Sequence, residues 1–308
     1  MKNSVYDYLS MKLKSIFEKY DNYTSIYEIR IRVGQPLVIC TDQGECGLLE
    51  DGVTGSIDKA YRVTAKDVKE IMEYVSGYSP YAYEEELKNG YITIPGGNRI
   101  GICGKAIIDI NGIKTIKNIT SINVRMARAV VGCSDRYMSY LYENNRLCHT
   151  LIISPPCSGK TTFLRDVIRN LSDGYGGILG KNVAVVDERS EIAGNYLGMR
   201  TDVLDGCPKS YGMLMLIRSM APEVIAVDEL GKKEDVEALE YCMNCGTTII
   251  ATIHAADLDE LKNKNIFRYM LENRLFKRIV VMSGIPKKGT VVDIFNEDGG
   301  SLWNGTSF

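Results

Sequence analysis

The sequence predicts an α/β fold with a mostly parallel sheet, preceded by a smaller α+β domain. Two observations lead to this fold class. In the second half of the chain, continuous runs of valine and isoleucine alternate with segments of helical periodicity, which is typical of parallel strands that helices cover on both faces. One of these runs, residues 151–153, leads into a loop of small residues and then into Gly-Lys-Thr-Thr. A strand, such a loop and a helix in this order indicate a phosphate-binding loop.

Length and composition set the broad class. The chain has 308 residues, of which 45% are hydrophobic and 25% charged, and this fits a globular protein of about two domains. We place an N-terminal α+β domain at residues 1–133 and the second domain at residues 134–308. The net charge of −2, without a run of lysines or arginines, argues against nucleic acid as a partner.

The cellular compartment follows from the cysteines and the apolar segments. Nine cysteines without framework spacing favour a reducing cytoplasm. No apolar segment is long enough to span a bilayer or reads as a signal peptide. We therefore expect a cytoplasmic protein without a membrane span, at most peripheral to a membrane.

The first domain reads as strands and short helices. Residues 27–39 alternate, with Ile29, Ile31 and Val33 on one face, which predicts a half-buried strand that is broken by Gly34 and Pro36. Thr64 three residues before Asp67 predicts a helix start. Residues 90–109, with Gly96 and Gly97, predict two strands joined by a turn.

In the second domain, residues 134–146 predict a connecting helix. Phe163 to Leu171 show helical spacing after the glycine-containing loop. The expected strands are residues 150–154, 183–187, 224–228, 248–253, 279–282 and 290–294.

The expected phosphate-binding loop is a set of nine consecutive residues: Ser154, Pro155, Pro156, Cys157, Ser158, Gly159, Lys160, Thr161 and Thr162. At the start of a helix, backbone N–H groups and the helix dipole meet phosphate oxygens. We expect Lys160 to neutralise the β- and γ-phosphates and the Thr161 hydroxyl to ligate Mg²⁺. Ser154 stands where the usual motif has its first glycine. We expect this substitution to restrict the loop and slow hydrolysis.

Pairs of acids follow two of the strands. Asp228 and Glu229 come directly after four apolar residues, as in a Walker B strand. We expect Asp228 to hold Mg²⁺ through water and Glu229 to polarise the attacking water. Asp187 and Glu188 end another strand in the same way, at the carboxyl edge of the sheet. The alternative is that these acids only cap strand ends in solvent.

His254 ends the strand at residues 248–253 and is also expected at the carboxyl edge. There its imidazole could sense a γ-phosphate by hydrogen bonding. The alternative is a core histidine with satisfied hydrogen bonds, which is the reading we favour for His149.

In their order, these motifs resemble those of the secretion ATPases, the motors of type II secretion, type IV pili and type IV secretion. In that superfamily of P-loop NTPases with a RecA-like core, they are the Walker A motif, the Asp box, the Walker B motif and the His box. Within it, the chain looks like the stage III sporulation protein AA family. Three segments carry this likeness: R-T-D-V-L-D-G-C-P-K at residues 200–209, G-Y-I-T-I-P-G-G-N-R-I-G-I-C-G at residues 90–104, and E-I-R-I-R-V-G-Q-P-L at residues 28–37.

The resemblance implies an ATPase that uses ATP with Mg²⁺ and assembles as a homo-hexamer. It also implies membrane-embedded channel proteins as partners, with the ring on the cytoplasmic, mother-cell side of a secretion-like channel to the forespore during sporulation. Nucleotide would lie between the two domains and beside the next subunit. Arginines that would reach the γ-phosphate are Arg99, Arg125 and Arg128 on the first domain and Arg218 on the second.

The chain departs from the secretion ATPases in two places. They usually read Glu-Asp where this chain has Asp187 and Glu188, and they often have glycine where Asp228 stands. Which acid activates water is therefore open, and Glu229 is our first choice. Two other functions remain: a nucleic-acid motor of the RecA type, which shares the core, and a scaffold that binds nucleotide with little hydrolysis.

Overall fold

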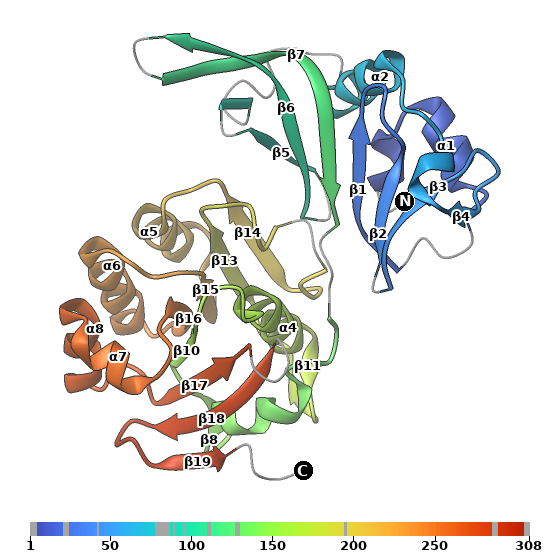
Figure 1. Cartoon of the computed structure of the whole chain (residues 1–308). Coiled ribbons are helices and arrows are strands. Elements are labelled where there is room, and N and C mark those ends of the chain that lie inside the picture. The colour runs from blue at the N-terminus through green and yellow to red at the C-terminus, as the bar shows by residue number, and fades with distance from the viewer. Residues whose placement is uncertain are drawn as a thin grey trace. The chain divides into compact units, whose positions relative to one another are not determined.

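The computed structural model describes residues 5–20, 25–41, 43–77, 87–88, 90–94, 97–109, 112–126, 130–193, 196–284 and 289–304. The chain forms two compact units, Met1–Arg128 and Ala129–Phe308 (Figure 1). Each unit has its own sheet and its own hydrophobic core, so each is described by itself.

The first unit is built on a seven-stranded antiparallel sheet with the order β4-β3-β2-β1-β7-β6-β5. Its elements are η1 (Val5–Tyr8), α1 (Met11–Phe17), β1 (Ile26–Arg32), β2 (Val38–Thr41), β3 (Gly44–Leu48), β4 (Thr54–Gly55), η3 (Ile57–Lys59), α2 (Ala65–Val75), β5 (Tyr91–Ile94), β6 (Asn98–Asp109) and β7 (Gly112–Arg125). Apolar side chains of α1 and α2 pack on one face of this sheet and form its core.

Most local predictions for this unit are confirmed. Helix α2 begins at the expected capping box, in which Thr64 and Asp67 satisfy each other's backbone N–H groups. The predicted break in the segment 27–39 is confirmed, because Gly34 adopts φ 74° and the chain turns between β1 and β2. Val33 is consequently 36% exposed, and the prediction that it shares the buried face of Ile29 and Ile31 is wrong. Gly96 lies outside the described residues.

The second unit contains an eight-stranded sheet with the order β14-β13-β15-β16-β10-β17-β18-β19. Its elements are η4 (Asp135–Leu141), β8 (Tyr142–Glu143), β9 (Arg146–Leu147), β10 (Thr150–Ser154), α4 (Lys160–Asp173), β11 (Gly174–Tyr175), β12 (Ile178–Leu179), β13 (Val183–Asp187), β14 (Thr201–Asp205), α5 (Lys209–Met220), β15 (Val224–Val227), α6 (Lys233–Asn244), β16 (Thr248–His254), α7 (Leu258–Asn263), α8 (Asn265–Glu272), β17 (Arg278–Ser283), β18 (Thr290–Asn296) and β19 (Ser301–Asn304). The strands from β14 to β17 are parallel, and β18 and β19 continue the sheet antiparallel. The α/β fold class with a mostly parallel sheet is therefore confirmed.

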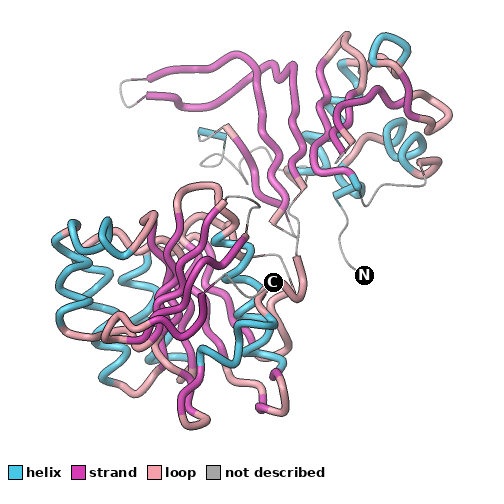
Figure 2. The backbone as a smooth tube through the Cα atoms, turned by 60° about the horizontal axis from the view of Figure 1, so that its bottom comes forward, coloured by secondary structure: helices cyan, strands magenta, loops and turns pink. Residues whose placement is uncertain are grey.

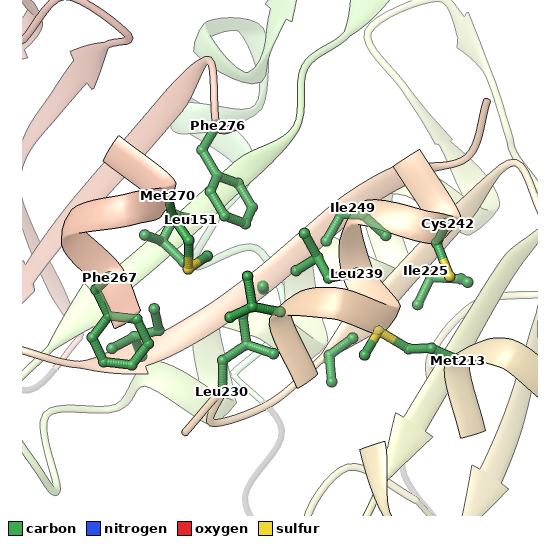
Figure 3. Close-up of a cluster of buried hydrophobic side chains, with 14 of the residues drawn as sticks. Leu151, Met213, Ile225, Leu230, Leu239, Cys242, Ile249, Phe267, Met270 and Phe276 are labelled. Carbon is green, nitrogen blue, oxygen red and sulfur yellow. The ribbon is translucent and has the colours of Figure 1, made fainter. Parts of the chain in front are cut away.

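Alternate residues of the strands face two separate cores. Ile153, Val227 and Ala251 pack with helices α5 to α8 on one face, whereas Ile152 and Ala226 pack with α4 and η4 on the other. Figure 2 shows helices on both sides of this sheet. Figure 3 shows the first of these cores, where side chains of α5, α6 and α8 meet the strands. This double burial explains the continuous runs of valine and isoleucine in the sequence.

The helix predicted for residues 134–146 is wrong. A short 3-10 helix, η4, occupies Asp135–Leu141 and is followed by the hairpin of β8 and β9. Asn144 and Asn145 both have positive φ, 48° and 61°, which an α-helix cannot accommodate and a two-residue hairpin turn requires. Strands β14 and β19 are also absent from the predicted set. Across the described residues, no helix is both long and apolar enough to cross a bilayer.

Candidate functional site

Strand β10 delivers the loop at residues 154–162 to the centre of the carboxyl edge of the parallel sheet. The strand pairs with β16 on one side and β17 on the other, and Ser154 lies opposite His254. Ser154 is fully buried and still extended. The positive φ angles of the loop fall instead on Cys157, at 60°, and on Gly159, at 90°. The position of Ser154 therefore does not require the backbone freedom of glycine.

Lys160 is the first residue of α4, and its side chain is 4% exposed. Among the described residues, its Nζ has no hydrogen-bond acceptor, although it lies 3.6 Å from Oδ1 of Asp228 and 3.8 Å from Oε1 of Glu229. Burial lowers the pKa of Lys160 more than these two carboxylates raise it. A buried ammonium group at a helix N-terminus, without its own hydrogen bonds, matches what a bound phosphate group would supply.

Asp228 lies just beyond β15 and joins three elements. One carboxylate oxygen accepts a hydrogen bond of 2.9 Å from Thr161 Oγ1, at the start of α4. The other accepts from Thr252 Oγ1 in β16. The Thr161 hydroxyl and the Asp228 carboxylate thus lie side by side next to Lys160. Both are hard oxygen donors, so this pair fits a magnesium ion that also binds phosphate.

Glu229 lies next to the same loop in a conformation that is rare for a side-chain-bearing residue, with φ 54°. Its backbone N–H donates to Thr252 Oγ1 at 2.8 Å. Its carboxylate contacts His254 Nε2 at 2.7 Å through one oxygen and Arg189 Nη1 through the other. Positive φ at such a residue costs on the order of 1 kcal/mol, and it aims the carboxylate along the sheet edge.

Asp187 and Glu188 have different roles although they are adjacent. Asp187 is buried, and its carboxylate accepts backbone hydrogen bonds from Glu191, Ile192 and Ala193, so it shapes the turn after β13. Glu188 instead bonds to Nζ of Lys209, at the start of α5. The hydrogen bond from Lys209 outweighs burial and holds the pKa of Glu188 below its usual value.

The two histidines also have different environments. His149 Nδ1 accepts a hydrogen bond of 3.1 Å from the backbone of Ile249, and burial lowers its pKa. It is a satisfied core residue. His254 Nε2 contacts Glu229, whereas its buried Nδ1 has no partner among the residues that the structure describes. Only His254 lies at the site.

The structure brings some of the expected arginines together and not others. Arg99 and Arg125 face each other across β6 and β7 in the first unit. Arg125 approaches Glu28 at 3.6 Å, and Arg99 lies over the ring of Tyr91. Arg128 lies outside the described residues. Arg218 is exposed near the C-terminal end of α5, a helix that runs from the carboxyl edge to the amino edge of the sheet, so within one subunit it is remote from the 154–162 loop.

Three residues at the site escaped the sequence reasoning: Arg189, Lys209 and Thr252. Arg189 and Lys209 line a cleft beside Glu229, together with the acidic residues of the site. Thr252 does not line this cleft, because it is fully buried. Arg189 directly follows the Asp187-Glu188 pair, and this proximity was a usable signal. Lys209 ends the segment 200–209, but its contact depends on the return of the chain from β14. Thr252 sits in an apolar strand and offered no signal.

Comparisons with known proteins agree on the family and the fold. The family model described as Sporulation stage III, protein AA, matches residues 1–302. Stage III sporulation protein AA of Bacillus subtilis (strain 168) is 38% identical over 309 residues, which cover 97% of this chain and 97% of that protein.

Solved structures with the same fold include secretion ATPases. The pilus retraction motor PilT, solved with bound ADP, superposes with a TM-score of 0.58 at 14% identity, over 87% of this chain and 76% of that one. The ATPase DotB of Legionella pneumophila superposes with a TM-score of 0.52 at 15% identity, over 88% of this chain and 77% of that one. The RecA-like fold of the secretion ATPases is therefore shown for this chain, and by sequence the chain belongs to the stage III sporulation protein AA family.

Proposed function

We propose that this protein binds ATP with Mg²⁺ at the 154–162 loop and hydrolyses it. One observation carries the proposal: the buried ammonium group of Lys160 lies at the N-terminus of α4, without a hydrogen-bond acceptor of its own among the described residues, beside Asp228 and Glu229. Leaving a buried ammonium without hydrogen bonds costs free energy that phosphate oxygens would recover. The fold that the chain shares with PilT, which was solved with ADP, supports the same ligand.

Each residue of the site would have its own role in ATP binding or hydrolysis. Lys160 would turn from the two carboxylates to the β- and γ-phosphates. Thr161 and Asp228 would hold Mg²⁺, which neutralises charge on the phosphates when it is bound. Glu229 would accept a proton from the attacking water, and the bond from its backbone to Thr252 keeps it in place. His254, bonded to the same carboxylate, would sense the γ-phosphate.

At the level of the cell, we propose that the protein works as a homo-hexameric motor at the cytoplasmic face of a membrane. Its partners would be membrane-embedded channel proteins, and its task the assembly or energising of a secretion-like channel between mother cell and forespore. Membership of the sporulation family and the secretion-ATPase fold support this role. In such a ring, Arg99, Arg125 and Arg128 would reach the nucleotide of a neighbouring subunit, and Glu188 and Asp187 would line the site.

Two variants test the proposal. Lys160→Ala should abolish ATP binding, because it removes the cation that meets the phosphates. Glu229→Gln should bind ATP with Mg²⁺ but not turn it over, because the amide cannot accept the proton. Binding is measured by calorimetry and turnover by phosphate release from the full chain. Normal turnover in both variants would contradict the proposal. Binding without turnover in the wild-type protein would instead favour the nucleotide-dependent scaffold.

A further inference from the structure

Arg189 and Glu229 form an ion pair beside the 154–162 loop. Nη1 of Arg189 bonds to one carboxylate oxygen of Glu229, while Nε2 of His254 lies 2.7 Å from the other. Both oxygens therefore have a partner. A water molecule that gives its proton to Glu229 must compete with the guanidinium group for the oxygen that faces Arg189.

The backbone around Arg189 is anchored, whereas its side chain is accessible. Asp187, two residues earlier, accepts three backbone hydrogen bonds from the turn that follows. Ser190, the next residue, donates a hydrogen bond of 2.7 Å to Asp205 in β14. The Arg189 side chain is nevertheless 61% exposed. The guanidinium group can thus change partners without a movement of the strand or the turn.

Arg189 and Lys160 both approach the Glu229 carboxylate: Arg189 bonds to Oε2, and Nζ of Lys160 lies 3.8 Å from Oε1. A terminal phosphate group bound by Lys160 would therefore come within reach of Arg189. Such a phosphate carries more charge than the carboxylate and offers the fork of the guanidinium two oxygens at once, whereas one oxygen of Glu229 is already bonded to His254. Of the two cations that line the cleft among the described residues, Lys209 is engaged by Glu188 and Arg189 is the one bonded to Glu229.

We propose that Arg189 discriminates ATP from ADP. Without a γ-phosphate it holds Glu229, and with one it moves onto the terminal phosphate and releases the carboxylate to a water molecule. This role rests on the proposed function, because it requires nucleotide at the 154–162 loop. Arg189 belongs to the same subunit as the loop and so is distinct from any arginine that a neighbouring subunit supplies.

The first experiment compares affinities of the full chain for ADP and for the non-hydrolysable triphosphate AMPPNP, both with Mg²⁺. Arg189→Ala should weaken AMPPNP binding about tenfold and leave ADP binding within about twofold, because a charge-assisted hydrogen bond is lost only with the triphosphate. Arg189→Lys keeps the charge but not the fork of the guanidinium group, so its affinity for AMPPNP should lie between those of the wild-type protein and Arg189→Ala. Arg274→Ala is a matched control, since Arg274 also forms an exposed ion pair, with Asp298. It should change neither affinity.

The second experiment is a double-mutant cycle for AMPPNP with Glu229→Gln. In the wild-type protein, Arg189 must give up its bond to Glu229 before it can bind phosphate. The glutamine is neutral and competes less, so the loss of affinity caused by Arg189→Ala should be larger in the Glu229→Gln background. Equal losses in both backgrounds would show that no exchange occurs.

The outcomes separate this role from the proposed function. If the wild-type protein binds ADP and AMPPNP but Arg189→Ala binds both as well as wild type, the discrimination role is overturned and the nucleotide site stands. The role is also overturned if Arg189→Ala weakens both ligands equally, because the side chain then only supports the loop. If the wild-type protein binds neither nucleotide, the proposed function itself fails. An unchanged thermal unfolding midpoint identifies variants that are correctly folded.

Discussion

Thr161 Oγ1 donates a hydrogen bond of 2.9 Å to the carboxylate of Asp228, and this bond joins the first turn of α4 to the end of β15. The two residues are 67 positions apart in the sequence. The contact exists because β15 and β10 flank the same strand, β16, and end at the same edge. It brings together the two oxygen donors that a magnesium ion would need at this site.

The Thr161–Asp228 contact leads to a prediction about magnesium. Thr161→Ala should weaken AMPPNP binding about tenfold in the presence of Mg²⁺ and little in EDTA, because the hydroxyl acts through the metal. Thr161→Ser keeps the hydroxyl and should restore the affinity. Calorimetric titrations with and without Mg²⁺ measure both effects. An equal loss in EDTA would mean that Thr161 contacts the nucleotide directly.

Cys157 provides a chemical probe of the loop. Its thiol is exposed, as is that of Cys245 at the end of α6. We expect ATP with Mg²⁺ to protect Cys157 from alkylation by iodoacetamide, since the nucleotide would cover the loop. Cys245 is the internal control, because α6 ends at the opposite edge of the sheet. Mass spectrometry of the peptides gives the alkylation rates of Cys157 and Cys245. Equal labelling of Cys157 with and without nucleotide would place the ligand elsewhere.

The proposed ring predicts complementation between two inactive variants. Arg125→Ala should bind ATP but turn it over slowly, because the arginine acts on the neighbouring subunit. A subunit with Arg125→Ala still has Lys160, and a subunit with Lys160→Ala still has Arg125. Mixing them one to one should restore about a quarter of the wild-type activity, the share of interfaces that join an intact site to an intact arginine.

Phosphate release from this mixture, over a range of protein concentrations, is the measurement. The side chain of Arg125 is 70% exposed, so we expect the variant to fold normally. A mixture no more active than its components, or a specific activity independent of protein concentration, would remove the ring and the trans arginine together.

Gly212 in α5 tests the packing of the second unit. Alanine normally stabilises a helix by about 1 kcal/mol relative to glycine. Here a Cβ atom would lie 2.5 Å from Cγ1 of Val186, a stiff, fully buried side chain in β13. Overpacking costs about 1–3 kcal/mol, so Gly212→Ala should be destabilising. Urea unfolding measures the change, and Ser219→Ala on the exposed side of the same helix should be nearly neutral. A stabilised Gly212→Ala protein would contradict the packing described above.

Asp67 should make the first unit sensitive to acid. Burial alone would raise the pKa of Asp67, but hydrogen bonds from Ser10, Thr64 and Tyr61 outweigh it and keep the pKa below its usual value. A carboxyl group with a lowered folded-state pKa stabilises the fold above its unfolded pKa of about 3.9, and this stability is lost as the pH falls through the folded value.

The measurement is the thermal midpoint between pH 6 and pH 3. Asp67→Asn should be less stable at pH 6 by on the order of 1–3 kcal/mol, because the amide is a weaker acceptor. Its midpoint should also fall less steeply toward pH 3 than that of the wild-type protein. Asp51→Asn, at an exposed carboxylate, serves as the control. Parallel pH profiles for Asp67→Asn and wild type would contradict the assignment.

The strands and the order of the motifs followed from local pattern. Residues buried on both faces of a parallel sheet must be apolar in succession, so residues 150–154 and 183–187 could be read directly. The cap formed by Thr64 and Asp67 could also be recognised from local sequence, because all its hydrogen bonds span three residues. Local pattern was insufficient at residues 134–146, where two asparagines with positive φ produce a hairpin instead of a helix.

The partners of the candidate site depended on the tertiary structure. The acids after β15, the lysine after β10 and His254 were recognisable in the sequence, but the contacts that they make with one another, with Arg189 and with Thr252 were not. Arg189, Thr252 and His254 meet at Glu229 because β13, β15 and β16 are neighbours in the sheet, although β14 stands between β13 and β15 along the chain. Hydrogen bonds between residues more than 20 positions apart depend on that strand order, and no local period in the sequence encodes it.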